Sequence, residues 1–184
     1  MATASPSESA ARVLRAALDR PPTLGAGRLV CIDGLAGSGK TTLARALAAQ
    51  APEALVLGTD EMLEGWRGLP GLGRSVEALL RPLAAGRPGH WRRWDWYADA
   101  WAETRTVEPG PLLVLEGVGS AAAAYDELIT LLVWVEADRD VRLARWLARD
   151  GEAMRPHWDT WLADEEALHA REDTRARADL VLRT

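Results

Sequence analysis

The chain has one cysteine in 184 residues, so no disulfide bond can form within it and nothing in its cysteine content points to an oxidising compartment. It also lacks any run near the roughly 20 apolar residues of a membrane-spanning helix. Its first ten residues, MATASPSESA, lack the basic and apolar regions of a signal peptide. The formal net charge of −5 disfavours binding to nucleic acid or anionic membranes, because proteins that bind these partners present a basic surface. We therefore expect a cytoplasmic protein with no nucleic-acid or membrane partner.

Lysine is nearly absent as well, because the sequence has 21 arginines and a single lysine, Lys40. That lysine lies in Gly34-Leu-Ala-Gly-Ser-Gly-Lys-Thr41, between the apolar run 29–32 and an Ala- and Leu-rich segment that ends near Gln50. This is the pattern G-x-x-x-x-G-K-S/T in the strand–turn–helix context of a phosphate-binding loop. A chain that otherwise uses arginine keeps lysine where a compact ammonium on a flexible stem is required. The stretch therefore predicts a nucleotide-phosphate loop rather than a structural Gly-rich turn.

Each residue type in this loop has a separate role in holding phosphate. The glycines permit backbone conformations closed to residues with a Cβ, so successive N–H groups can face inwards. Those groups and the positive end of the following helix form a cradle for phosphate oxygens. Lys40 can reach the β- and γ-phosphates, and the Thr41 hydroxyl can ligate magnesium. The predicted nucleotide-binding residues are Gly34, Ala36, Gly37, Ser38, Gly39, Lys40, Thr41 and Thr42.

Apolar runs alternate with helical or irregular segments along the rest of the chain. Runs at 54–57, 111–115, 131–135 and 178–182 predict four more strands beside 29–32. An N-terminal helix is expected within residues 1–22, starting with a capping box from Ser5 to Glu8 and ending before Pro21. Further helices are expected over 75–85, 121–129 and 158–176. The pattern predicts one α/β domain over 1–184, with a five-stranded, mostly parallel sheet flanked by helices on both faces.

Two acidic residues follow predicted strands, where ligands bind in an open parallel α/β sheet. Asp60, after the strand 54–57, is placed either as a catalytic base or as the N-cap of the next helix. Glu116, which closes the strand 111–115, is placed to meet magnesium or its waters. Aspartate is the usual residue there, so the longer glutamate is expected to act through water or substrate.

Two arginine-bearing segments leave alternatives open. Residues 64–110 follow no regular alternation of elements, and His90–Tyr97 places Arg92 and Arg93 among aromatic rings. That segment either binds a flat or anionic small molecule or packs on the domain as a Trp-rich surface loop. Residues 138–150 predict an amphipathic helix with Arg142, Arg145 and Arg149 in one sector. This helix is either a lid over the phosphates or a solvated basic face paired with its own aspartates.

In order and spacing, residues 28–182 resemble the P-loop nucleoside and nucleotide kinases, most closely the uridine kinase and phosphoribulokinase group. The resemblance rests on the stretch from Ile32 to Thr42, on Asp60, on Leu115-Glu116-Gly117 and on the helix 138–150. It implies a P-loop NTPase fold with an Arg-rich lid helix, ATP and Mg²⁺ as cofactors, and transfer of the γ-phosphoryl group to a hydroxyl of a small-molecule acceptor.

The resemblance also implies roles for individual positions. Asp60 would be the base and would contact metal and acceptor, while Glu116 would contact metal or acceptor and Thr41 the metal. The catalytic cations would be Lys40 and the lid arginines 142, 145 and 149, and the insertion 64–110 would bind the acceptor through Arg92 and Arg93. Asp60-Glu61-Met62 replaces the Asp-Asp-aromatic stretch of that family, and the acceptor segment is unusually Trp-rich. Because of these departures, the resemblance supports a kinase better than it supports uridine as the acceptor.

Three functions remain open at this stage. The favoured hypothesis is a magnesium-dependent small-molecule kinase. A nucleotide-binding ATPase or switch protein without a small acceptor shares the phosphate loop, but the candidate lid and the lack of a guanine-binding motif count against it. An inactive binding module derived from a kinase is disfavoured by the intact Lys40 and Thr41. The sequence identifies neither the acceptor nor the oligomeric state.

Overall fold

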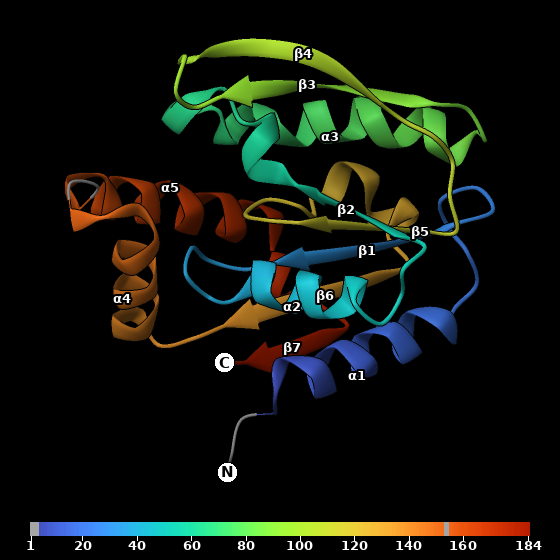
Figure 1. The fold of residues 1–184 in the computed structure, drawn as a ribbon, viewed down its shortest axis with the longest axis horizontal. Coiled ribbons are helices and arrows are strands. Elements are labelled where there is room, and N and C mark those ends of the chain that lie inside the picture. The colour runs from blue at the N-terminus through green and yellow to red at the C-terminus, as the bar shows by residue number, and fades with distance from the viewer. Residues whose placement is uncertain (1–3, 153–154) are drawn as a thin grey trace.

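A five-stranded parallel sheet forms the centre of the fold (Figure 1). The structure is a computed structural model that describes residues 4–152 and 155–184. The strand order is β2 (Ala54–Gly58), β5 (Leu112–Glu116), β1 (Arg28–Asp33), β6 (Leu131–Glu136) and β7 (Leu180–Arg183), and every neighbouring pair is parallel. The five apolar runs predict these strands correctly, with ends displaced by one or two residues.

Alternate residues of the strands feed two separate hydrophobic cores, as expected for a sheet covered on both faces. On one face Val30 and Ile32 pack with α1 (Pro6–Leu18) and α2 (Lys40–Ala48). On the other face Leu29 and Cys31 pack with α3 (Leu69–Ala84), the short 3-10 helix η3 (Ala123–Leu128) and α5 (Arg155–Glu172). The phosphate loop leaves β1 at the middle of this sheet, between the two layers of helices.

Helix α1 begins at the predicted capping box. The Glu8 amide donates to Ser5 Oγ at 3.3 Å, and the Ser5 amide donates to Glu8 Oε2 at 2.8 Å. The helix ends at Leu18, before Pro21. Local sequence therefore specifies both ends of this element.

Residues 64–110 are regular, contrary to the sequence-based expectation. They form the 3-10 helix η2 (Gly65–Arg67), α3, and the antiparallel pair β3 (Gly89–Asp95) and β4 (Ala100–Val107). Helix α3 starts at Leu69 instead of residue 75, with Pro70 in its first turn. A register shift between Arg92 and Trp94 interrupts the alternation of β3 and hides the strand pattern. The β3–β4 pair covers α3 on the side away from the central sheet (Figure 1).

The C-terminal third also departs from the expected boundaries. Helix α4 spans Arg139–Asp150, and α5 begins at Arg155. Earlier in the chain, the 3-10 helix η1 (Thr59–Met62) follows β2. The single helix expected over 158–176 is divided at Asp173, where φ is 49°, and continues as α6 (Thr174–Arg177). Over 4–152 and 155–184, no helix is both long and apolar enough to span a bilayer.

Candidate functional site

The phosphate loop connects β1 to α2 and has the backbone that its glycines predict. The φ angles of Gly34, Gly37 and Gly39 are 143°, 75° and 101°. Gly37 also lies against α4, since a Cβ placed there would be 2.3 Å from the carbonyl oxygen of Arg142. Gly39 is the N-cap of α2, so the loop leads into a helix N-terminus whose N–H groups and dipole favour an anion.

Lys40 lies inside the loop, with only 7% of its surface exposed. Its Nζ donates to the carbonyl oxygens of Gly34 at 2.7 Å and Leu35 at 3.0 Å. Burial lowers the pKa of this ammonium, an effect opposed by nearby carboxylates, of which Glu165 contributes most. The charge is thus held next to the loop backbone, where it can act on bound phosphate.

Two carboxylates and a hydroxyl gather beside this lysine. The Thr41 hydroxyl donates to Glu116 Oε1 at 3.0 Å, and burial raises the pKa of Glu116, an effect opposed by Lys40 and by this hydrogen bond. Asp60 lies within η1, whose N-cap is Gly58, so Asp60 is not the N-cap of this element. A Cβ built on Gly58 would be 2.5 Å from Asp60 Oδ1 and 3.9 Å from Glu116 Oε1, so both carboxylates face the same backbone position.

These oxygen donors suit a hard divalent cation such as Mg²⁺. Within the part of the chain that the structure describes, no cluster of three or more His, Cys, Asp or Glu side chains could hold a metal by itself. A magnesium ion held by Thr41, Asp60 or Glu116 would therefore complete its coordination with phosphate and water oxygens, as it commonly does. The donor set fits a metal bound together with a nucleotide.

The three arginines predicted to share one sector of α4 have different environments. Arg142 is buried, with its Cζ 5.7 Å from the Trp158 ring centroid and Nη1 3.5 Å from the Ala36 carbonyl oxygen. The exposed Arg145 donates through Nη1 to the Thr184 hydroxyl at 2.7 Å. Arg149 is also exposed and pairs with Asp150 at 2.8 Å.

Arg149 is the arginine of the three whose charge is coupled to the gathered carboxylates. Its pKa is raised first by the hydrogen bonds that it donates to Asp150 and further by the negative charges of Asp150, Asp60 and Glu116. Arg142, in contrast, contacts the backbone of the phosphate loop at Ala36. The three predicted lid cations therefore have different partners: the Ala36 carbonyl for Arg142, the Thr184 hydroxyl for Arg145 and the Asp150 carboxylate for Arg149.

Arg92 and Arg93 are both engaged within the β3–β4 pair. Arg92 lies over the Trp101 ring at 5.8 Å and donates to the Ala102 carbonyl at 3.2 Å. Arg93 pairs with Glu103 at 2.9 Å and with Asp95 at 3.2 Å. The turn between β3 and β4 reaches the site through Trp96, whose Nε1 donates to the Asp60 carbonyl oxygen at 3.1 Å.

Sequence reasoning missed Asp33, which shapes the start of the phosphate loop. Asp33 is fully buried and accepts from the amides of Gly34 at 2.7 Å, Gly119 at 3.0 Å and Ala121 at 3.1 Å. It therefore ties the start of the phosphate loop to the segment after β5. Burial raises its pKa, an effect opposed chiefly by His169. The signal available in the sequence is an acidic residue that closes an otherwise apolar strand.

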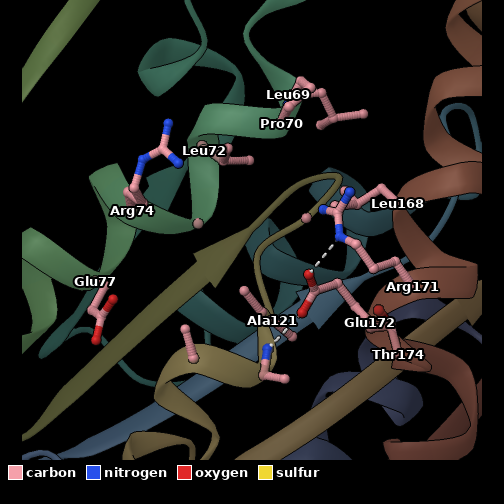
Figure 2. Close-up of a pocket in the computed structure, with 15 residues that line it drawn as sticks. Leu69, Pro70, Leu72, Arg74, Glu77, Ala121, Leu168, Arg171, Glu172 and Thr174 are labelled. Carbon is pink, nitrogen blue, oxygen red and sulfur yellow. Dashed lines mark hydrogen bonds and ion pairs between the residues drawn. The ribbon is translucent and has the colours of Figure 1, made fainter.

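A cavity of about 500 Å³ lies between α3, the segment after β5 and the C-terminal part of α5 (Figure 2). Its walls are largely leucine and alanine, with Arg74, Glu77, Arg171 and Glu172 as its charged residues. Glu172 accepts from the Ala123 amide at 2.8 Å and from Arg171 Nε at 3.2 Å. The cavity is lined by none of the site residues predicted from the sequence.

No protein-family model matches the chain, and no curated protein matches it. Solved structures do. A possible uridine kinase from Bacillus stearothermophilus is 21% identical with a TM-score of 0.66, and the match covers 95% of this chain and 97% of that one. A putative fructose transport system kinase from a Silicibacter species is 24% identical with a TM-score of 0.62, covering 94% and 98%. A D-glycerate 3-kinase from Cryptococcus neoformans is 14% identical with a TM-score of 0.54, covering 93% and 86%.

These matches span nearly the whole of each chain. Together with the strand order and the loop geometry, they show that the chain shares the fold of these kinase structures. The expected α/β fold, a five-stranded parallel sheet flanked by helices, is therefore confirmed, whereas the role of residues 138–150 as a lid stays a prediction.

Proposed function

We propose that this protein is an ATP- and magnesium-dependent kinase that transfers the γ-phosphoryl group to a hydroxyl of a small molecule. The observation that supports this most strongly is the gathering of Lys40, Thr41, Glu116 and Asp60 beside one phosphate loop. These residues come from α2, the end of β5 and η1, which meet at the carboxyl edge of the sheet.

Each of these groups has a role in the proposed reaction. The loop amides and Lys40 hold the β- and γ-phosphates, and Arg149 adds positive charge on the side of the carboxylates. Thr41, Glu116 and Asp60 are the residues that would hold magnesium, which would neutralise phosphate charge when bound. Asp60 orients the acceptor hydroxyl and takes its proton as the new oxygen–phosphorus bond forms and the bond to the β-phosphate breaks, leaving ADP.

The test is ADP release from ATP and magnesium across a panel of nucleosides, nucleoside monophosphates, sugars and small alcohols. We expect stimulation by one acceptor class, and loss of that stimulation in Lys40→Ala. Lys40→Met serves as a second blank because it fills the buried position without supplying charge. Thermal melts of both variants establish that they are folded.

Slow ADP release that is equal with and without every acceptor would contradict the proposal. It would favour instead a nucleotide-binding ATPase or switch protein that needs no acceptor.

A further inference from the structure

Glu165 of α5 is a carboxylate held inside the protein against the phosphate loop. None of its surface is exposed. Its Oε1 accepts from the Ala36 amide at 2.9 Å and from Trp161 Nε1 at 2.6 Å, and Oε2 lies 3.1 Å from the same amide. A buried carboxylate is unfavourable unless hydrogen bonds and nearby cations compensate it, and here both are present. The hydrogen bonds to the Ala36 amide and Trp161 tie this carboxyl group to the phosphate loop.

The backbone of Ala36 is contacted by side chains of two helices. Glu165 on α5 binds its amide, while Arg142 on α4 has Nη1 3.5 Å from its carbonyl oxygen. The cations that face Glu165 are Lys40 from α2 and Arg142 from α4. Glu165 thus contacts the phosphate loop at the Ala36 amide and lies close to Lys40.

A row of aromatic rings continues from Glu165 towards Asp60. Trp161 contacts Trp66 edge to face at a centroid distance of 5.6 Å, and Trp66 contacts Trp96 in the same way at 5.2 Å. Trp96 then donates to the Asp60 carbonyl oxygen at 3.1 Å. His157 stacks on Trp66 with centroids 5.2 Å apart, which fixes the middle ring from α5. The contacts are continuous from the loop to η1.

We propose that Glu165 is a positioning residue for the phosphate loop, and that Trp161, Trp66 and Trp96 join it to Asp60. We call Glu165, Trp161, Trp66 and Trp96 together the aromatic brace. The brace sets the position of the loop that holds the donor relative to the residue proposed to receive the acceptor proton. Its effect on the acceptor side rests on the proposed function, whereas its effect on nucleotide binding does not.

The first experiment measures ADP affinity by calorimetry for Glu165→Gln and Glu165→Met. Glutamine keeps an oxygen at the Oε1 position, which receives both hydrogen bonds, so we expect its dissociation constant within about threefold of wild type. Methionine has similar length but leaves the buried Ala36 amide without an acceptor, so we expect ADP binding to weaken by about 10-fold or more. Glu166→Met, at the exposed neighbouring position, is the matched control and should bind ADP normally.

The second experiment interrupts the brace at its centre with Trp66→Leu. The ring contacts of Trp66 are with Trp96, His157 and Trp161. We expect ADP binding to weaken by about 3- to 10-fold and amide exchange over Thr59–Met62 to accelerate. In the Glu165→Met background the further loss of affinity should be small, because the connection is already broken. Trp101→Leu is the control, since that ring packs on Trp94 outside the brace.

Equal ADP affinity in wild type, Glu165→Met and Trp66→Leu would overturn this proposal and leave the proposed function intact. Equal losses in Glu165→Gln and Glu165→Met would also overturn the positioning role, because the hydrogen bonds alone would then not explain the effect. Failure of the wild type to bind ADP would overturn both proposals together.

Discussion

Gly37→Ala is the most direct test of how the phosphate loop and α4 fit together. Gly37 has φ at 75°, a region that alanine rarely adopts, and a Cβ there would lie 2.3 Å from the Arg142 carbonyl oxygen. Two other glycines separate these two effects. Gly86 has φ at 70° but nothing within 4 Å of an added Cβ, and Gly71, within α3, has neither a positive φ nor a neighbour within that distance.

The three substitutions are therefore expected to differ in size and in sign. Gly71→Ala should stabilise the protein by about 0.4–1 kcal/mol by reducing the entropy of the unfolded chain. Gly86→Ala should destabilise it by about 1–2 kcal/mol, the cost of a left-handed conformation for alanine. Gly37→Ala adds to that cost an overpacking term of about 1–3 kcal/mol, because neither α4 nor the loop backbone can move freely. The predicted total for Gly37→Ala is about 2–5 kcal/mol.

Urea unfolding gives the three free energies, and thermal melts should follow at about 2–4 °C per kcal/mol for a chain of this size. ADP affinity, measured in parallel, should fall in Gly37→Ala and remain unchanged in the other two variants. If Gly37→Ala destabilises the protein no more than Gly86→Ala does, the close approach of α4 to the loop is refuted.

Further substitutions test separate parts of the site. Asp60→Asn should lower turnover by about 100-fold or more while changing ADP affinity by less than about threefold, and normal turnover would remove Asp60 as the base. Arg149→Met should lower kcat more strongly than Arg145→Met does, because the charge of Arg149 is coupled to Asp60 and Glu116; equal effects would argue against that role. Burial raises the pKa of Glu165 to about 7, so between roughly pH 4.5 and 7 the folded state binds more protons than the unfolded state and stability falls as pH rises. Glu165→Gln should remove this loss, which amounts to up to about 3 kcal/mol between pH 5 and 8 in urea titrations, and parallel pH profiles for the two proteins would contradict it.

The parts of the fold that sequence reasoning predicted are those specified by local patterns. The apolar runs are the strands of the sheet, the Ser5–Glu8 capping box starts α1, and the loop glycines adopt the positive φ angles that the motif requires. The β3–β4 pair was missed because the register shift at Arg92–Trp94 removes the period of two on which strand recognition depends.

The site residues divide in the same way. Lys40 and Thr41 belong to a contiguous motif, and the structure brings them together with Glu116 and near Asp60. Glu165 could not be found by such reasoning, because its partner is the Ala36 amide, 129 residues away in the sequence. A glutamate in a charged helix usually faces solvent, and only the tertiary packing of Trp161 and α5 on the loop shows that this one does not.

The strand order also determines when the sheet can assemble as the chain is synthesised. β1 carries the start of the phosphate loop, yet its two neighbours are β5 and β6, and Arg28 pairs with Leu112. The loop therefore has no completed sheet to hold it until the chain has grown well past residue 112. Helix α3 and the β3–β4 pair are local in sequence and can form earlier, whereas β7 must wait for the residues up to Arg183. Nascent chains that already display the phosphate-loop sequence consequently pass through a long interval with an unpaired apolar strand, a state that favours slow folding and transient association with chaperones.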